Sequence, residues 1–180
     1  MWCGIPSSRG LSMPMSKPKK TRPELSLAVQ YGVTEPRLPR WRLRRWAVRA
    51  FLAALEIHGS APSRLQLTMR LVGLAEGRRL NASFRGKDYA TNVLTFEYGS
   101  QPDGTASGDI VICVPVMARE AREQRKAFLS HAAHLVVHGT LHAIGYDHLN
   151  ARDAKRMESL ETRILSSIGI VDPYTIGDAL

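Results

Sequence analysis

The chain has 180 residues, of which 44% are hydrophobic and 23% are charged, and it contains 14 glycines and 10 prolines. This length is typical of one domain, and the glycine and proline content lies below the roughly 25–30% that marks low-complexity sequence. No stretch approaches the ~18 apolar residues of a membrane helix, and residues 1–22 lack the apolar segment of a secretory signal. Two cysteines, Cys3 and Cys113, cannot build a disulfide framework. We therefore expect a soluble, single-domain cytoplasmic protein.

The formal net charge of +9 is unevenly distributed. Residues 1–22 contain five basic residues and no acid, which leaves 20 of the 25 basic residues against all 16 acidic residues in the rest of the chain. The segment is also rich in Ser, Pro and Gly and has no apolar periodicity. This composition predicts a disordered basic leader over residues 1–23 and a folded domain over residues 24–180.

The first predicted element is an amphipathic helix around residues 43–55. Its apolar residues repeat at intervals of three and four, which is the period of a helix with one buried face. Arg42, Arg45 and Arg49 line the opposite face. They are candidates for binding phosphate groups, and the alternative is an ordinary solvated helix face.

Further elements follow in chain order. Apolar and polar residues alternate over 65–71, which predicts a half-buried strand. A helical stretch over 74–84 leads into the polar loop Arg85-Gly86-Lys87-Asp88. Residues 92–98 and 109–114 are rich in β-branched and aromatic residues and predict two more strands, with a turn between them at 99–108. Arg85 and Lys87 suit phosphate binding, because arginine offers a planar fork and Gly86 lets backbone N–H groups approach. An ordinary solvated turn is the alternative.

The last third of the chain is predicted to be helical. At least one helix lies within 116–144, and another runs over 151–168, with Asn150 as its N-cap and Gly169 as its stop. Strands in the middle of the chain, with helices before, between and after them, predict an α+β (mixed α/β) single domain. We expect about four strands in a mixed sheet flanked by helices.

Histidines cluster in the segment HAAHLVVHGTLHAIGYDH, residues 131–148. His138 and His142 are four residues apart and project from one helix face, so they can share a metal ion. His134 lies on the same face, but it is eight residues from His142, a rise of about 12 Å. Two imidazole nitrogens on one zinc lie within about 4 Å of each other. We therefore exclude His134 as a partner to both, and we expect His131 and His134 to be packed or surface residues.

The third predicted ligand is His148, because Gly145 permits a left-handed turn that carries the chain back towards the ion. The predicted ligand set is His138, His142 and His148. Three histidines leave one position of a tetrahedral ion open, as in a catalytic site. Asp147 is either a hydrogen-bond partner of a ligand histidine or a simple turn residue.

The spacing of His142, Gly145 and His148 matches the second half of the metzincin protease pattern HExxHxxGxxH. Gly139 stands where those proteases carry their general-base glutamate. One interpretation of Gly139 is close helix packing, and the other is room for substrate beside the metal.

The segment HGTLHAIGYDH resembles the YbeY family of metal-dependent endoribonucleases, and so do residues 80–96, 107–113 and 157–174. The resemblance covers roughly residues 25–174. It implies zinc bound by His138, His142 and His148, Arg85 in the active-site cleft, and a metal cleft at the end of a long helix. Family members often carry Pro where this chain has Ala90, and Asp where it has Asn92. The loop after Lys87 is therefore expected to be less rigid, and no carboxylate acts at position 92.

The predicted function is metal-dependent, single-strand endoribonuclease activity in maturation of the small-subunit ribosomal RNA 3′ end and in ribosome quality control. Ribosomal RNA and small-subunit particles are the expected partners, and zinc is the expected cofactor, although another transition metal is possible. Two alternatives stay open: a zinc metallopeptidase, and a noncatalytic ribosome-associated protein whose zinc only holds the end of the helix.

Overall fold

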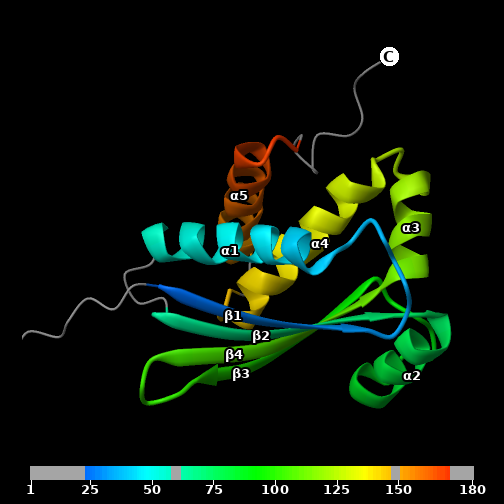
Figure 1. Ribbon diagram of the computed structural model, residues 1–180, viewed down its shortest axis with the longest axis horizontal. Coiled ribbons are helices and arrows are strands. Elements are labelled where there is room, and N and C mark those ends of the chain that lie inside the picture. The colour runs from blue at the N-terminus through cyan, green and yellow to red at the C-terminus, as the bar shows by residue number, and fades with distance from the viewer. Residues whose placement is uncertain (1–22, 58–61, 147–150, 171–180) are drawn as a thin grey trace, which may run out of the picture.

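The computed structural model describes residues 23–57, 62–146 and 151–170. The predicted leader before Pro23, the predicted cap Asn150 and the predicted ligand His148 lie outside these ranges. Figure 1 shows the described chain as one mixed sheet with helices packed against it.

The described residues form four strands and five helices. In chain order they are β1 (Glu24–Tyr31), α1 (Arg40–Ile57), β2 (Arg64–Val72), α2 (Leu74–Arg85), β3 (Val93–Ser100), β4 (Thr105–Cys113), α3 (Val114–Glu123), α4 (Phe128–Ala143) and α5 (Ala151–Ser167). The strand order in the sheet is β1-β2-β4-β3. β1 and β4 run parallel to β2, and β3 pairs antiparallel to β4 at the edge. The predicted α+β fold is confirmed.

β1 is the strand that the sequence analysis missed. Leu25 and Leu27 are buried, while their neighbours Glu24 and Ser26 are exposed, so the strand has the alternation of a half-buried element. It lies directly after the basic leader and was not separated from that segment by composition. Its register pairs Leu25 with Leu65 and Leu27 with Leu67 of β2. The apolar face of the sheet therefore begins one strand earlier than expected.

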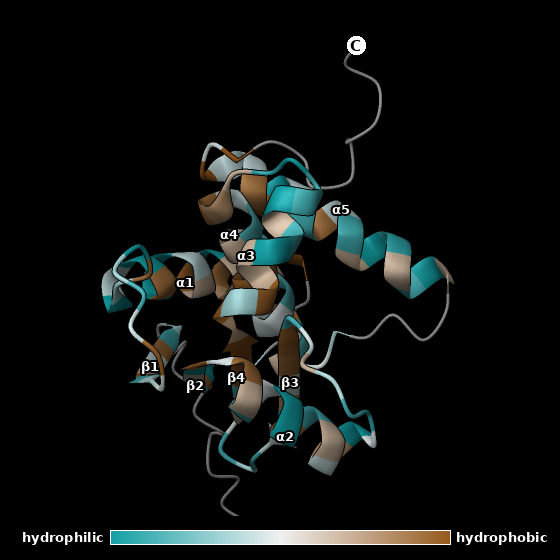
Figure 2. Ribbon diagram, turned by 90° about the vertical axis from the view of Figure 1, so that its right-hand side faces the viewer, coloured by the Kyte–Doolittle hydropathy of each residue, from teal (hydrophilic) through white to brown (hydrophobic). Residues whose placement is uncertain are grey.

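The two faces of the sheet are covered differently. The large core lies between one face and helices α1, α4 and α5, and it includes Phe51, Met69, Ile110, Leu141 and Ile164. A smaller apolar cluster on the other face packs against α2 and contains Val72, Leu94, Val111, Cys113 and Val116. Figure 2 shows α2 alone below the sheet and the other helices above it. Burial raises the pKa of the Cys113 thiol, which keeps it protonated and structural.

The region predicted to hold at least one helix contains two, α3 and α4. The turn between them includes Arg125, which adopts a left-handed backbone conformation with φ of 52°. α4 then crosses the sheet at short range: a Cβ atom added at Gly108 of β4 would lie 2.7 Å from the Cβ of Ala143. Only glycine fits at this crossing, so Gly108 sets how closely the histidine-bearing helix approaches the strands.

Within the residues that the structure describes, no helix is long and apolar enough to cross a membrane.

Candidate metal centre

α4 carries four histidines on one face. His131, His134, His138 and His142 follow one another at spacings of three, four and four residues, which brings them to one side of a helix. His131 is buried, whereas the other three are partly exposed. The side chain of His138 is 28% exposed and that of His134 is 17% exposed. The predicted alignment of His138 and His142 is confirmed, with their ring centroids 4.5 Å apart.

Glu161 of α5 is the acid that organises this face. It is fully buried, with 0% of its surface exposed. Its Oε1 lies 2.8 Å from Nδ1 of His138, and its Oε2 lies 3.1 Å from Nε2 of His134. A buried carboxylate needs hydrogen-bond donors to offset its desolvation, and the two imidazoles supply N–H groups. We call His134, His138 and Glu161 the Glu161 cluster.

The contact with Glu161 fixes the tautomer of His138. An ionised carboxylate only accepts hydrogen bonds, so the proton of a neutral His138 ring lies on Nδ1 and the lone pair on Nε2. Carboxylate–histidine pairs of this kind are the usual support of metal-binding histidines, because they orient the ring and raise its basicity. The donor chemistry of the site therefore fits a transition metal held by imidazole nitrogen.

Within the described ranges, one group of three residues has ligand atoms close enough to hold a metal ion, and it is the Glu161 cluster. Its ligand atoms all lie within 4.8 Å of one another. The structure thus brings His134, which we expected to be a packed or surface residue, beside His138 and a carboxylate. His134 is too far along α4 from His142 to share one ion with both His138 and His142. An acid from another helix nevertheless brings His134 and His138 together.

Glu161 was missed in the sequence, although a signal for it exists. The neighbouring positions Met157, Leu160, Ile164 and Leu165 form the buried stripe of α5. An acid within such a stripe must have a buried partner. The histidines of the preceding helix that had no predicted metal-binding role were candidates for that partner. Contacts between two helices cannot be derived from spacing within one of them.

A second histidine–carboxylate group lies one to two turns earlier on α4. Nε2 of His131 lies 3.0 Å from Oε2 of Glu120 on α3, and Nδ2 of Asn92 donates to the same oxygen at 2.9 Å. We call these three residues the Glu120 cluster. His131 is confirmed as a packed residue. Burial lowers its pKa, and the Glu120 carboxylate opposes that shift without cancelling it.

The structure distinguishes the two interpretations of Gly139. A Cβ atom at this position would lie 3.0 and 3.2 Å from two side-chain carbons of Ile110 and 3.2 Å from Oγ1 of Thr95. Gly139 is buried and faces the sheet, so it serves close packing of α4 on β3 and β4. A glutamate, the general base of the related protease pattern, does not fit there.

α4 ends in the predicted left-handed turn. Gly145 has a φ of 91°, a left-handed conformation that favours glycine. The backbone N–H groups of Gly145 and Tyr146 donate to the carbonyls of His142 and Leu141, which closes the helix. The chain that follows leads to His148 and Asp147, whose predicted roles lie outside the described residues.

Arg85 and Lys87 lie at the end of α2, the helix that covers the opposite face of the sheet from α4 and its histidines. Arg85 is the last residue of α2, and Gly86 ends that helix with a φ of 66°. Both cationic residues are exposed. Phe84 packs edge-on against Phe96 of β3, with ring centroids 4.9 Å apart. The structure therefore places Arg85 at the edge strand and does not bring it into the Glu161 cluster.

The arginines near the start of α1 differ in their contacts and exposure. Arg40 and Arg44 donate to backbone carbonyls of β1, at Leu27 and Leu25, and their role is structural. Arg42 is partly buried and donates to the Arg37 carbonyl. Arg45 and Arg49 are exposed. Of the predicted arginine face, these last two project most openly to the surface.

Three comparisons with known proteins bear on identity. The family model described as Endoribonuclease YbeY matches residues 34–169. The Endoribonuclease YbeY of Bordetella avium is 65% identical over 160 residues, covering 89% of this chain and 99% of the relative. That of Bordetella pertussis is 67% identical over 151 residues, covering 84% and 96%.

A solved structure supports the fold. The solution structure of TM1509 from Thermotoga maritima aligns with a TM-score of 0.53 at 22% identity, and the alignment covers 83% of this chain and 99% of that chain. None of these comparisons supports the metallopeptidase or the noncatalytic alternative. The predicted family and enzyme class are confirmed: the chain belongs to the YbeY family of endoribonucleases.

Proposed function

We propose that this chain is a cytoplasmic, metal-dependent endoribonuclease that cleaves single-stranded ribosomal RNA, in maturation of the small-subunit 3′ end and in ribosome quality control. The observation that carries the metal dependence is the buried carboxylate of Glu161 against Nδ1 of His138, one helical turn from His142. The RNA substrate is supported by the family, whose curated relatives are named endoribonucleases.

His138, His142 and His148 are the proposed metal ligands, with Glu161 as the acid that holds His138. Two ligand atoms on one tetrahedral ion, each at about 2.0–2.2 Å, lie about 3.4 Å apart. The contacts of Glu161 to His138 and His134, at 2.8 and 3.1 Å, are shorter and fit hydrogen bonds. The buried position of Glu161 also leaves little room for a phosphodiester beside it, whereas His138 and His142 are partly exposed.

Zinc is the proposed ion, and when bound it would supply Lewis acidity towards the phosphodiester and an acidified water. The chain's own residues prepare for that chemistry. Glu161 holds the proton of His138 on Nδ1 and fixes the ring plane, so Nε2 presents its lone pair in one direction. Gly139 keeps α4 close to the sheet, which fixes the height of both histidines above β3.

Arg85 and Lys87 are the proposed phosphate contacts near the edge strand. Both are exposed at the end of α2, and an arginine can bind a phosphate through two parallel hydrogen bonds. An RNA strand lying across β3 would reach them on one side and the histidines on the other. Arg42, Arg45 and Arg49 of α1 are weaker candidates for contacts with the same RNA backbone.

The experiment compares four variants on a labelled ribosomal RNA fragment, with metal content measured on each purified protein. We expect His142→Ala and His148→Ala to lose both metal and cleavage. His134→Ala should keep metal, because His134 supports Glu161 without binding the ion. Arg85→Ala should keep fold and metal and lose cleavage, because it removes a charge that offsets the transition state.

Each component has an outcome that contradicts it. Loss of metal in His134→Ala with retention in His148→Ala would show that His134, His138 and Glu161 form the ligand set. RNA cleavage that survives His142→Ala would identify a contaminating nuclease. Casein serves as the control substrate, and casein hydrolysis without RNA cleavage would establish the metallopeptidase alternative.

A further inference from the structure

α5 lines a basic pocket on the side of the helix away from Glu161. The pocket has a volume of about 420 Å³ and is lined by six residues of α5 and one of α1: Arg152, Lys155, Arg156, Ser159, Leu160, Arg163 and Ile57. Four of the seven are cationic, and no carboxylate is among the described residues that line it. Neither the family resemblance nor the histidine motif pointed to this surface.

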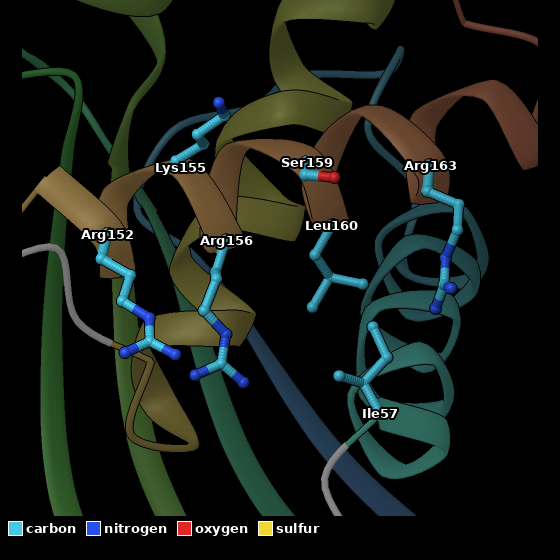
Figure 3. A pocket seen from close by; sticks show the side chains of 7 residues that line it. All are labelled: Ile57, Arg152, Lys155, Arg156, Ser159, Leu160 and Arg163. Carbon is cyan, nitrogen blue, oxygen red and sulfur yellow. The ribbon is translucent and has the colours of Figure 1, made fainter.

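The three arginines act from one side of the helix. Arg152, Arg156 and Arg163 are separated by four and seven residues, which places them on one face of α5. Figure 3 shows all three side chains extending from α5 on the side that holds Leu160 and Ile57, with the guanidinium groups of Arg152 and Arg156 next to each other. Lys155 extends in the opposite direction. We call Arg152, Arg156 and Arg163 the arginine row; the apolar side chains of Leu160 and Ile57 lie between Arg156 and Arg163.

Arg163 of this row makes a weak contact with an acid of α1. Arg163 lies 3.9 Å from Glu56, and both side chains are exposed, at 56% and 75%. Exposed pairs of this kind contribute little free energy and are easily exchanged for another anion. Of the acids of α5, Glu161 is buried, and Asp153 and Glu158 are not among the residues that line the pocket.

The same helix also packs against α4, where Oε1 of Glu161 lies 2.8 Å from Nδ1 of His138. α5 thus connects two features: its inner face carries the carboxylate of the Glu161 cluster, and its outer face carries the arginine row.

We propose that this α5 pocket binds the phosphate backbone of the RNA strand outside the segment that is cleaved. The proposal rests on the proposed RNA substrate. Guanidinium groups bind phosphate oxygens through paired hydrogen bonds, and Ser159 adds a hydroxyl donor. Backbone contacts fix the position of a nucleic acid and do not select its sequence. The pocket would hold flanking RNA so that α5 and α4 together set which phosphodiester reaches the histidines.

The test uses the full chain and a single-stranded RNA oligonucleotide, with binding measured by fluorescence anisotropy over a series of salt concentrations. The pocket variant is Arg156→Gln with Arg163→Gln. The matched control, Arg119→Gln with Arg122→Gln, removes the same charge from α3. We expect the pocket variant to bind about tenfold more weakly, and the slope of log affinity against log salt to fall by about 1.4, which is two phosphate contacts at roughly 0.7 each.

The control should match the parent protein, and two oligonucleotides of unrelated sequence should respond alike. In cleavage assays at low substrate concentration, the pocket variant should show a higher KM at unchanged kcat and unchanged metal content, because the pocket does not contact the ion. An equal loss of RNA affinity in the pocket variant and the control would overturn the proposal, because the loss would then depend only on the net charge of the protein.

Two further outcomes distinguish this proposal from the proposed function and from a lipid-binding site. If the protein binds RNA through the pocket but cleaves none, the proposed function fails and the pocket assignment stands. If cleavage and RNA binding are intact in the pocket variant while binding to phosphatidylglycerol vesicles is lost, the pocket is a lipid site and the proposal is wrong.

Discussion

The Glu120 cluster and the Glu161 cluster place the same chemistry on one helix with opposite exposure. In the Glu120 cluster the histidine is buried, with 5% of its side chain exposed, and the acid is 24% exposed. In the Glu161 cluster the acid is buried, with 1% exposed, and the two imidazoles are 17% and 28% exposed. The first arrangement encloses its imidazole and ties three elements together. The second anchors its acid and presents imidazole rings to the surface, as a metal site requires. The buried partner is therefore the histidine in the packed cluster and the acid in the candidate metal-binding cluster.

Among the substitutions that test this comparison, Glu161→Ala is expected to have the largest effect on stability. The substitution leaves the N–H groups of two partly exposed imidazoles without their acceptor and opens a cavity, so we expect a loss of about 2–4 kcal/mol in the free energy of unfolding. Urea denaturation measures it. The matched control is Glu158→Ala, an exposed position on the same helix, which should change stability by less than about 0.5 kcal/mol. Similar losses in both variants would mean that Glu161 is not the anchor.

A smaller effect, on metal binding, should distinguish the clusters directly. Glu161→Gln keeps the volume of the side chain and removes its charge, so the fold should persist while metal affinity falls about 10- to 100-fold, as is typical when the partner of a ligand histidine is changed. Competition with a chelator measures the affinity. Glu120→Gln should leave the affinity unchanged, and a comparable fall in that variant would show that the two clusters act as one unit.

The smallest effect is a change in pH dependence at His131. Its pKa in the folded state is lowered by burial from the usual 6.5, so the unfolded chain takes up a proton at a pH where the folded chain does not. Stability contributed by the neutral ring is present above pH 6.5 and is lost as the pH falls from there towards the folded pKa. His131→Gln, which keeps a donor for Glu120, should flatten this part of the curve.

The measurement is the free energy of unfolding of both proteins between pH 5 and pH 8, a range chosen around the ordinary histidine pKa. Parallel curves for the parent and His131→Gln would show that His131 is not the group responsible.

The sequence predicted helices and strands best where one periodic pattern decided the element. α1, β2 and α5 each bury the residues that their spacing selected, such as Leu43, Leu67 and Leu160. β1 was missed because its alternation of Leu25 and Leu27 follows a basic segment whose composition dominated the interpretation. Boundaries shifted at β3 and β4, where strand pairing extends into the predicted turn.

Features of the candidate site were likewise predictable only where they depend on spacing within one element. Adjacency of His138 and His142 follows from helix geometry, and it was predicted. Glu161 lies 23 positions from its partner His138, and only the packing of α5 on α4 brings them together. The proximity of His134 to this acid was unpredictable for the same reason. The arginine pocket depends on the end of α1 approaching α5, which no pattern within either helix specifies.

The contact at Gly139 also limits the routes by which this fold can evolve. A related protease pattern needs a glutamate at this position, yet any side chain there meets Ile110 and Thr95 at 3.0–3.2 Å. A lineage that acquired the acid first would carry an overpacked core, at a cost of about 1–3 kcal/mol, before it gained any new activity. The neighbouring strands would have to acquire smaller residues beforehand, and those changes would themselves leave a cavity. The step from this fold to the protease pattern therefore requires several substitutions that are each unfavourable alone.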